Sequence, residues 1–170
     1  QKMTTIAEQV HLLSAGTAQE KAAAAYSLAH LASSTNPQTQ ATIARAGGVA
    51  PLVSLCRHGV GKQKQLAALG LCGLSAGNTG LAHEIVQAGG IDPLVTLARD
   101  GELGEKENAA TALGHLAQNQ RDHAKAIVRA GGIGLLVALV EEGTAQQMEC
   151  AALALAYLTN DENAGAITVA

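Results

Sequence analysis

Six histidines are the residues of this 170-residue sequence with the most versatile chemistry, because a neutral imidazole can bind a metal ion or act as a general base. Four of them are expected at helix surfaces or in loops, where a solvated imidazole is the ordinary role: His11, His58, His83 and His123. His30 and His115 belong to helices that the spacing described below places two repeats apart. Because packed helices stand roughly 8–10 Å from their neighbours, these two cannot share one ion, so we predict no metal site and no cofactor.

A glycine and lysine segment, GVGKQ at residues 59–63, has the composition of a phosphate-binding loop. The GxxxxGK[ST] motif fails, because Cys56 replaces the first glycine and Gln63 replaces the hydroxyl residue. We therefore interpret this segment as a turn between two helices.

The three cysteines, Cys56, Cys72 and Cys150, form an odd set without CxxC spacing. This argues against a disulfide framework and against a zinc site, and it favours a reducing compartment, the cytoplasm or the nucleus. No histidine or carboxylate is arranged to activate Cys150, so packing is its expected role. Because the sequence holds no catalytic constellation, we predict that the protein is not an enzyme.

Composition excludes two further classes of function. The formal net charge of −3 is too modest for a nucleic-acid binder, which usually carries a clustered basic surface. No apolar run approaches the roughly 20 residues that span a bilayer, and the first ten residues lack the features of a signal peptide. The charge is uneven: residues 1–85 hold 6 Lys or Arg against 3 Asp or Glu (+3), and residues 86–170 hold 5 against 11 (−6).

The elements that position these residues follow from a repeat. Pairs of glycines recur at intervals of 42 residues, at Gly47 and Gly48, Gly89 and Gly90, and Gly131 and Gly132. Other columns keep the same register: Ile43, Ile85, Ile127; Val53, Val95, Val137; Leu55, Leu97, Leu139; and Gly59, Gly101, Gly143. A period of roughly 40 residues is the signature of an α-solenoid, whose units stack in one direction.

Each repeat is predicted to contain three helices. A short first helix, such as residues 81–88, ends at the glycine pair, where Gly89 can take the left-handed conformation that closes a helix. The second helix carries Pro93 in its first turn, where no intrahelical hydrogen bond is lost. The long third helix, such as residues 106–117, has a buried stripe at helical spacing: Ala109, Ala110, Leu113 and Leu116.

Three helices in 42 residues, the AGG[IV]xPLVxL turn and a third helix ending in ALxxL resemble the armadillo repeat over essentially the whole chain. A HEAT array usually has two helices per repeat and lacks this glycine junction. The resemblance implies an all-α, right-handed α-solenoid of about four repeats, at residues 1–34, 35–76, 77–118 and 119–159, with a further repeat starting at 160–170. The chain enters at the second helix of its first repeat, and we expect it to be an excerpt of a longer protein.

In armadillo proteins the third helices line a concave groove that binds extended polypeptide, with an Asn clamp near the end of each third helix and often a Trp one turn earlier. This sequence departs from both columns. The Asn column reads His30, Gly73, His115 and Tyr157, and the Trp column reads Tyr26, Leu69, Thr111 and Leu153. No clamp residue carries over, so importin-like reading of nuclear localisation signals is not expected. Helical spacing adds further groove positions one turn earlier: Gln65, Leu66, Glu107, Asn108 and Glu149.

The resemblance therefore implies a non-enzymatic scaffold that binds a protein or peptide along the groove of the third helices. Glu107 and Glu149, together with the acidic second half, predict that a basic segment of the ligand lies against repeats three and four. The alternative is an assembly or tethering module that acts through the repeat ends or the convex face, including self-association through uncapped ends. For any single polar groove residue, solvation alone remains a sufficient explanation.

Overall fold

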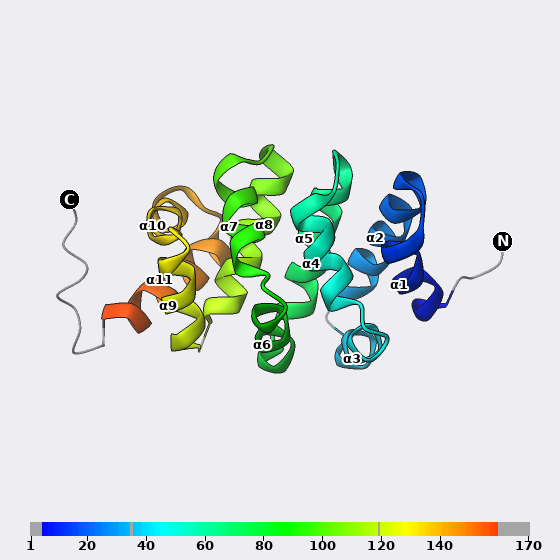
Figure 1. Ribbon diagram of the computed structural model, residues 1–170. Coiled ribbons are helices and arrows are strands. Elements are labelled where there is room, and N and C mark those ends of the chain that lie inside the picture. Colours follow the sequence, from blue (N-terminus) through cyan, green and yellow to red (C-terminus); the bar gives the residue numbers. More distant parts are fainter. Residues whose placement is uncertain (1–4, 35, 119, 160–170) are drawn as a thin grey trace.

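The computed structural model describes residues 5–34, 36–118 and 120–159, and within these ranges it consists of α-helices without a β-strand (Figure 1). The helices are α1 (Ile6–Ala15), α2 (Ala18–Ser33), α3 (Pro37–Arg45), α4 (Val49–His58), α5 (Lys62–Ser75), α6 (Thr79–Gln87), α7 (Ile91–Asp100), α8 (Leu103–Ala117), α9 (Arg121–Arg129), α10 (Ile133–Glu142) and α11 (Ala145–Thr159). Residues 160–170, expected to begin a further repeat, lie outside the described residues.

The helices stack in one direction, which confirms the predicted α-solenoid. The third helices of the repeats form a continuous row, because α2 packs on α5, α5 on α8, and α8 on α11. The second helices lie beside them, with α1 against α4 and α4 against α7, while α3 and α6 are seen end-on at the lower edge of Figure 1. The four expected repeats contain α1–α2, α3–α5, α6–α8 and α9–α11.

The glycine pairs make the corner between the first and second helices, as predicted. Gly89 has a φ of 75°, and Gly47 and Gly131 have φ values of 77° and 84°. The amide of the following glycine, Gly90, donates to the carbonyl oxygen of Ile85 at 3.0 Å. A Cβ on Gly90 would lie 2.7 Å from Ile85 Cγ2 and 2.9 Å from the Ile85 carbonyl oxygen. The first glycine therefore supplies a left-handed turn, and the second permits close approach.

One side chain near the start of each third helix satisfies a backbone amide in the preceding turn. We call these four the capping residues: Glu20, Gln63, Glu105 and Gln147. Their side-chain oxygens accept hydrogen bonds from the amides of residues 17, 60, 102 and 144 at 2.8, 3.0, 2.9 and 2.8 Å respectively. A free amide at a helix start is thereby paired in every repeat, by either a carboxylate or a carboxamide.

The core is aliphatic and runs through all the repeats as one cluster. The stripe predicted on the third helix is buried, with Ala109, Leu113 and Leu116 at 0% exposure and Ala110 at 4%. Small alanine side chains at these positions let neighbouring third helices pack closely, and this packing fixes the row of third helices on which the groove prediction depends.

Candidate interaction surfaces

We define the groove face as the exposed side of α2, α5, α8 and α11. In its first half, Tyr26 is 59% exposed, and its ring centroid lies 6.2 Å from that of His30 at an interplanar angle of 55°. Leu69 of α5 lies opposite these rings, and together with Ser33 and Ser34 the three side chains line a shallow pocket of about 240 Å³. This pocket is walled mainly by apolar and ring atoms, so it suits an apolar or aromatic side chain.

The second half of the groove face is polar. Glu107 and Glu149 are exposed, and the Thr111 hydroxyl donates to the Glu107 carbonyl oxygen at 2.8 Å while accepting from Gln147 Nε2 at 3.0 Å. Asn108 Nδ2 donates to the Gln65 carbonyl oxygen at 3.3 Å and so links α8 to α5. Thr111 and Asn108 therefore hold neighbouring repeats together, whereas the two carboxylates face solvent.

The remaining groove positions are placed differently. Leu66 is half-buried and packs against the core. Gly73 is buried: a Cβ there would lie 2.8 Å from the carbonyl carbon of Ala32, so this glycine lets α5 approach the backbone of α2. The expected groove positions Leu153 and Tyr157 lie in α11, but their side chains fall outside the described residues.

His115 is 7% exposed and lies between α8 and α5. Its Nδ1 is 3.3 Å from the Cys72 carbonyl oxygen. Burial lowers the pKa of His115 below its usual value, and the hydrogen bond to Cys72 opposes that change. Burial therefore favours the neutral imidazole. Together with Gly73, it forms part of the packing between repeats and offers a ligand little surface.

A histidine pair corrects one sequence expectation. His123, expected to be solvated, is 4% exposed, because the first turn of α9 packs against the end of α8. Its Nδ1 lies 2.9 Å from the Leu116 carbonyl oxygen, and its Nε2 lies 3.3 Å from Nδ1 of the exposed His83. His11 and His58 are exposed as expected. Within the part of the chain that the structure describes, no three histidine, cysteine or acidic side chains gather as a metal site.

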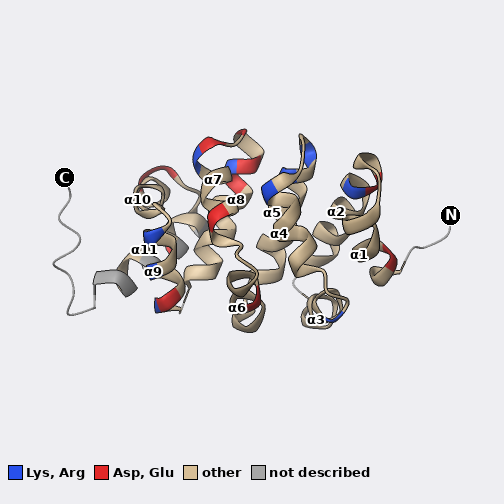
Figure 2. Ribbon diagram, in the orientation of Figure 1, with Lys and Arg blue, Asp and Glu red and all other residues tan. Residues whose placement is uncertain are grey.

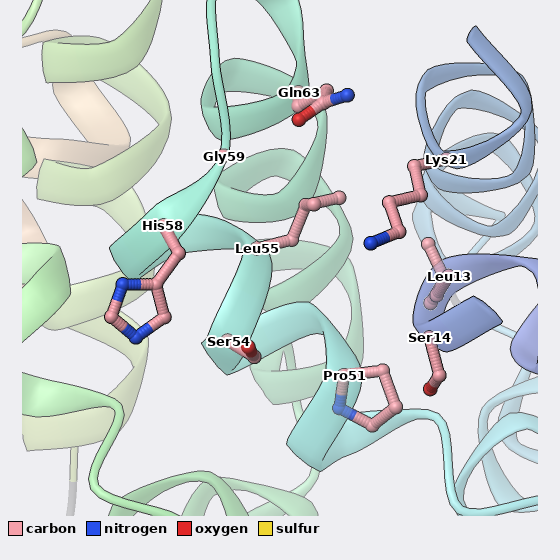
Figure 3. Close-up of a pocket in the computed structure, with 9 residues that line it drawn as sticks. All are labelled: Leu13, Ser14, Lys21, Pro51, Ser54, Leu55, His58, Gly59 and Gln63. Atoms are coloured by element: carbon pink, nitrogen blue, oxygen red, sulfur yellow. The ribbon is translucent and has the colours of Figure 1, made fainter. Parts of the chain in front are cut away.

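Crevices between successive repeats form a second set of surfaces. The first, of about 270 Å³, lies between α1–α2 and α4–α5, and Figure 3 shows Lys21 extending from α2 across it toward Leu55 of α4. The second has a volume of about 150 Å³ and the third about 330 Å³. Each is lined by a lysine of the preceding third helix: Lys21, Lys64 and Lys106. The sequence reading missed these lysines, although they share one column of the repeat alignment.

Two further sequence expectations concern the chain between and along the helices. Residues 59–61 form the turn between α4 and α5, with Gly59 capping α4 and Gly61 at a φ of 51°, while Lys62 and Gln63 already begin α5; the segment is therefore a junction between two helices, as interpreted. Among the described helices, no single one is long and apolar enough to cross a membrane; α9 and α10 together reach that length and composition but are bent by 107° at the break between them.

Comparisons with known proteins agree with this architecture. Residues 78–118 match the family model of the armadillo/beta-catenin-like repeat, and a comparison with curated proteins found no match. The chain is similar to the crystal structure of an engineered protein, with 32% identity, a TM-score of 0.77 and coverage of 92% of this chain and 63% of the other. The chain thus spans less than two thirds of that protein's length.

Two designed proteins share the fold. A computationally designed armadillo repeat protein for modular peptide recognition has 24% identity and a TM-score of 0.80, over 94% of this chain and 67% of that one. A designed armadillo repeat protein in complex with the peptide (KR)4 has 22% identity and a TM-score of 0.77, over 92% and 65%. The family model identifies residues 78–118 as an armadillo/beta-catenin-like repeat, and the described chain as a whole shares the fold of designed armadillo repeat proteins.

Proposed function

We propose that the chain is a non-enzymatic scaffold that binds an extended polypeptide along the groove face. The observation that carries this proposal is the row of third helices, which sets exposed side chains from successive repeats side by side. Weak contacts at each repeat then add along one extended ligand. The groove residues that are exposed or half-buried are Tyr26, His30, Gln65, Leu66, Leu69, Glu107, Asn108, Thr111 and Glu149.

The first half of the groove face supplies an apolar anchor point. The pocket between Tyr26, His30 and Leu69 is open to solvent and large enough for one apolar side chain of a ligand. Aromatic side chains of this kind bury a large area at low entropic cost, which is why they dominate the energetics of many interfaces. We therefore assign most of the binding free energy to this pocket.

The second half of the groove face supplies charge. Glu107 and Glu149 project from adjacent third helices, and both are exposed. We assign a basic segment of the ligand to this half, where the carboxylates accelerate encounter and set the register of the peptide. A designed armadillo repeat protein that was solved with the peptide (KR)4 supports a basic ligand on this scaffold.

The test is a titration of the protein with labelled peptides that carry an aromatic residue followed by a run of Lys and Arg. Tyr26→Ala and the double reversal Glu107→Lys plus Glu149→Lys should each weaken binding. A matched control reverses the same number of charges off the groove face, at the exposed residues Asp122 and Glu141. If the control weakens binding as much as the groove reversal, net charge alone explains the result and the groove assignment is wrong.

A further inference from the structure

The three crevices between repeats are built from equivalent positions. In each, a lysine comes from the third helix of one repeat, and an apolar wall comes from the second helix of the next. The lining positions correspond as follows: Leu13, Cys56 and Ala98; Lys21, Lys64 and Lys106; Pro51, Pro93 and Leu135; Leu55, Leu97 and Leu139. The molecule therefore presents one construction three times, and differences among the copies point to what each copy can bind.

The copies differ in their carboxylates. Asp92 lines the second crevice, and Glu107 and Glu142 line the third, whereas the residues that line the first include no Asp or Glu. The acid next to Lys21 in sequence is Glu20, whose carboxylate accepts hydrogen bonds from the Thr17 amide and hydroxyl, both at 2.8 Å. Glu20 is therefore engaged at the start of its own helix.

The capping residues show the same difference. The first crevice is lined by Gln63, but the equivalent residue in the next repeat is Glu105. Burial raises the pKa of Cys56, in the wall of the second crevice, to about 12; the negative charge of Glu105 adds to this rise, and Lys64 opposes it. The carboxylate of Glu105 and the ammonium group of Lys64 thus both influence the second crevice. Among the described residues, none of the three crevice lysines makes an ion pair, so the first crevice differs from the others in having no carboxylate in its lining.

We propose that the first crevice binds the carboxylate of an acidic side chain from an extended segment of a partner protein, with Lys21 as its counter-ion. The exposed hydroxyls of Ser14 and Ser54 line the same space and can donate hydrogen bonds to that carboxylate. This acidic segment would supply the charge that Asp92 and Glu105 supply near Lys64. The site is separate from the groove face and carries the opposite charge preference.

The shape and charge of the crevice favour an acidic peptide over a phosphate group. Pro51 and Leu55 of α4 give one side an apolar wall and Leu13 of α1 adds an apolar side chain from the other, which suits the methylene groups of a glutamate side chain (Figure 3). A single ammonium group balances one carboxylate, whereas a phosphate monoester carries a charge of roughly −1.5 to −2 at pH 7. The volume of about 270 Å³ accommodates one side chain, so the rest of the segment lies along the surface.

The experiment titrates the 170-residue chain at low salt with a fluorescent hexaglutamate peptide, and in parallel with hexalysine and with inorganic phosphate. Lys21→Gln should weaken hexaglutamate binding about tenfold, since it removes the charged partner. Gln63→Glu should weaken it by a similar factor, because it places in the first crevice the carboxylate that the next repeat already has. This variant keeps the hydrogen bond to the preceding turn that Glu105 makes, but it loses the donation from Gln63 Nε2 to the Ala18 carbonyl oxygen at 2.7 Å, so urea unfolding must show that it folds.

Matched controls separate the crevice from general electrostatics. Lys62→Gln removes an exposed lysine that does not line the crevice, and Gln147→Glu makes the same change at the third crevice; both should leave hexaglutamate affinity within about twofold of wild type. Tyr26→Ala should also leave it unchanged, which keeps this result independent of the groove proposal. The proposal is overturned if hexaglutamate does not bind, if Lys62→Gln has the effect of Lys21→Gln, or if inorganic phosphate competes at equal concentration.

Discussion

On the groove face, repeats 1 and 2 present the rings of Tyr26 and His30, whereas repeats 3 and 4 present the carboxylates of Glu107 and Glu149 on an equivalent scaffold. In Figure 2, α5 carries only basic residues, while the region of α7 and α8 carries both signs. The corners between first and second helices nevertheless have nearly equal φ values in both halves, and the capping residues make equivalent hydrogen bonds. Surface chemistry therefore changes along this solenoid while the backbone geometry of the repeats stays the same. Each repeat fixes its own turns and leaves its outer side chains unconstrained.

The largest expected effect tests whether the two halves share one scaffold. Gly48→Ala and Gly90→Ala would each place a Cβ 2.7–2.8 Å from an isoleucine Cγ2 and 2.9–3.0 Å from a carbonyl oxygen. Because backbone must move in both cases, we expect each variant to lose about 3 kcal/mol of unfolding free energy. Urea unfolding measures this loss. Unequal losses in the two variants would show that the corners are not equivalent.

The control for this pair is Gly134→Ala. Gly134 lies in α10 with no atom within 4 Å of the position that a Cβ would occupy and with a negative φ, so alanine should be neutral or stabilise by up to about 1 kcal/mol. A destabilised control would mean that any added methyl group disturbs the repeat, and the corner argument would then lose its specificity.

The second effect separates the halves by packing space. Ala68 and Ala110 occupy equivalent positions on α5 and α8; Ala68 is completely buried, whereas Ala110 lines the crevice of about 330 Å³. Ala68→Leu should overpack the row of third helices and cost about 1–3 kcal/mol, while Ala110→Leu should cost less because its side chain can enter the crevice. Thermal or urea unfolding compares them directly, and equal losses would contradict the difference in packing.

The repeat predicted the fold well because its signals are local. A glycine pair, a proline in a first helical turn and an apolar stripe at helical spacing each act through their own chain neighbours. Gly89 is left-handed and Ala109 is buried, as the sequence indicated. Such rules transfer from one copy to the next, so the intervals of 42 residues between the glycine pairs located equivalent helices in successive repeats.

The surfaces were harder to predict because they form between repeats. Gly73 is buried by the backbone of α2, and His123 is buried by the end of α8. Both contacts join neighbouring repeats, so the sequence of a single repeat does not predict them. The first crevice likewise combines Lys21 of one repeat with Leu55 of the next. The alignment contains the column of three lysines, but only the packing shows that they line crevices.

The third effect concerns the thiol of Cys56, an ionisable group in the first half whose equivalent in the next repeat is Ala98. Burial raises the pKa of Cys56 to about 12 from 9.0, while the equivalent residue of the next repeat is Ala98. Above pH 9 the unfolded chain loses this proton and the folded chain keeps it, so the thiol's contribution to stability declines as pH rises from 9 toward 12, by about 1.4 kcal/mol per pH unit.

Cys56→Ala tests this by installing the residue of the next repeat. The variant should be less stable than wild type at pH 8, because sulfur burial is lost, and the gap should narrow as the pH rises toward 11. Urea unfolding at a series of pH values measures both chains, and the difference between them cancels the titration of other groups. A gap that stays constant from pH 8 to 11 would contradict burial of the thiol at this position.

The smallest expected effect distinguishes the two halves of the groove face by their response to salt. Glu107→Gln and Glu149→Gln should each lower the affinity for the peptide that carries an aromatic residue and a basic run about two- to fivefold at low salt. The effect is small because exposed charge pairs contribute little free energy. At physiological ionic strength, where the Debye length is about 8 Å, both effects should shrink. Tyr26→Ala removes apolar contact area instead, so its effect on affinity should be insensitive to salt.

Fluorescence anisotropy over a salt series gives the salt dependence of affinity for all three variants, with Asp122→Asn as the off-groove control. If the loss on Tyr26→Ala shrinks with salt as the glutamate effects do, the first half binds through charge as well, and the division of the groove face into an apolar half and an electrostatic half is wrong.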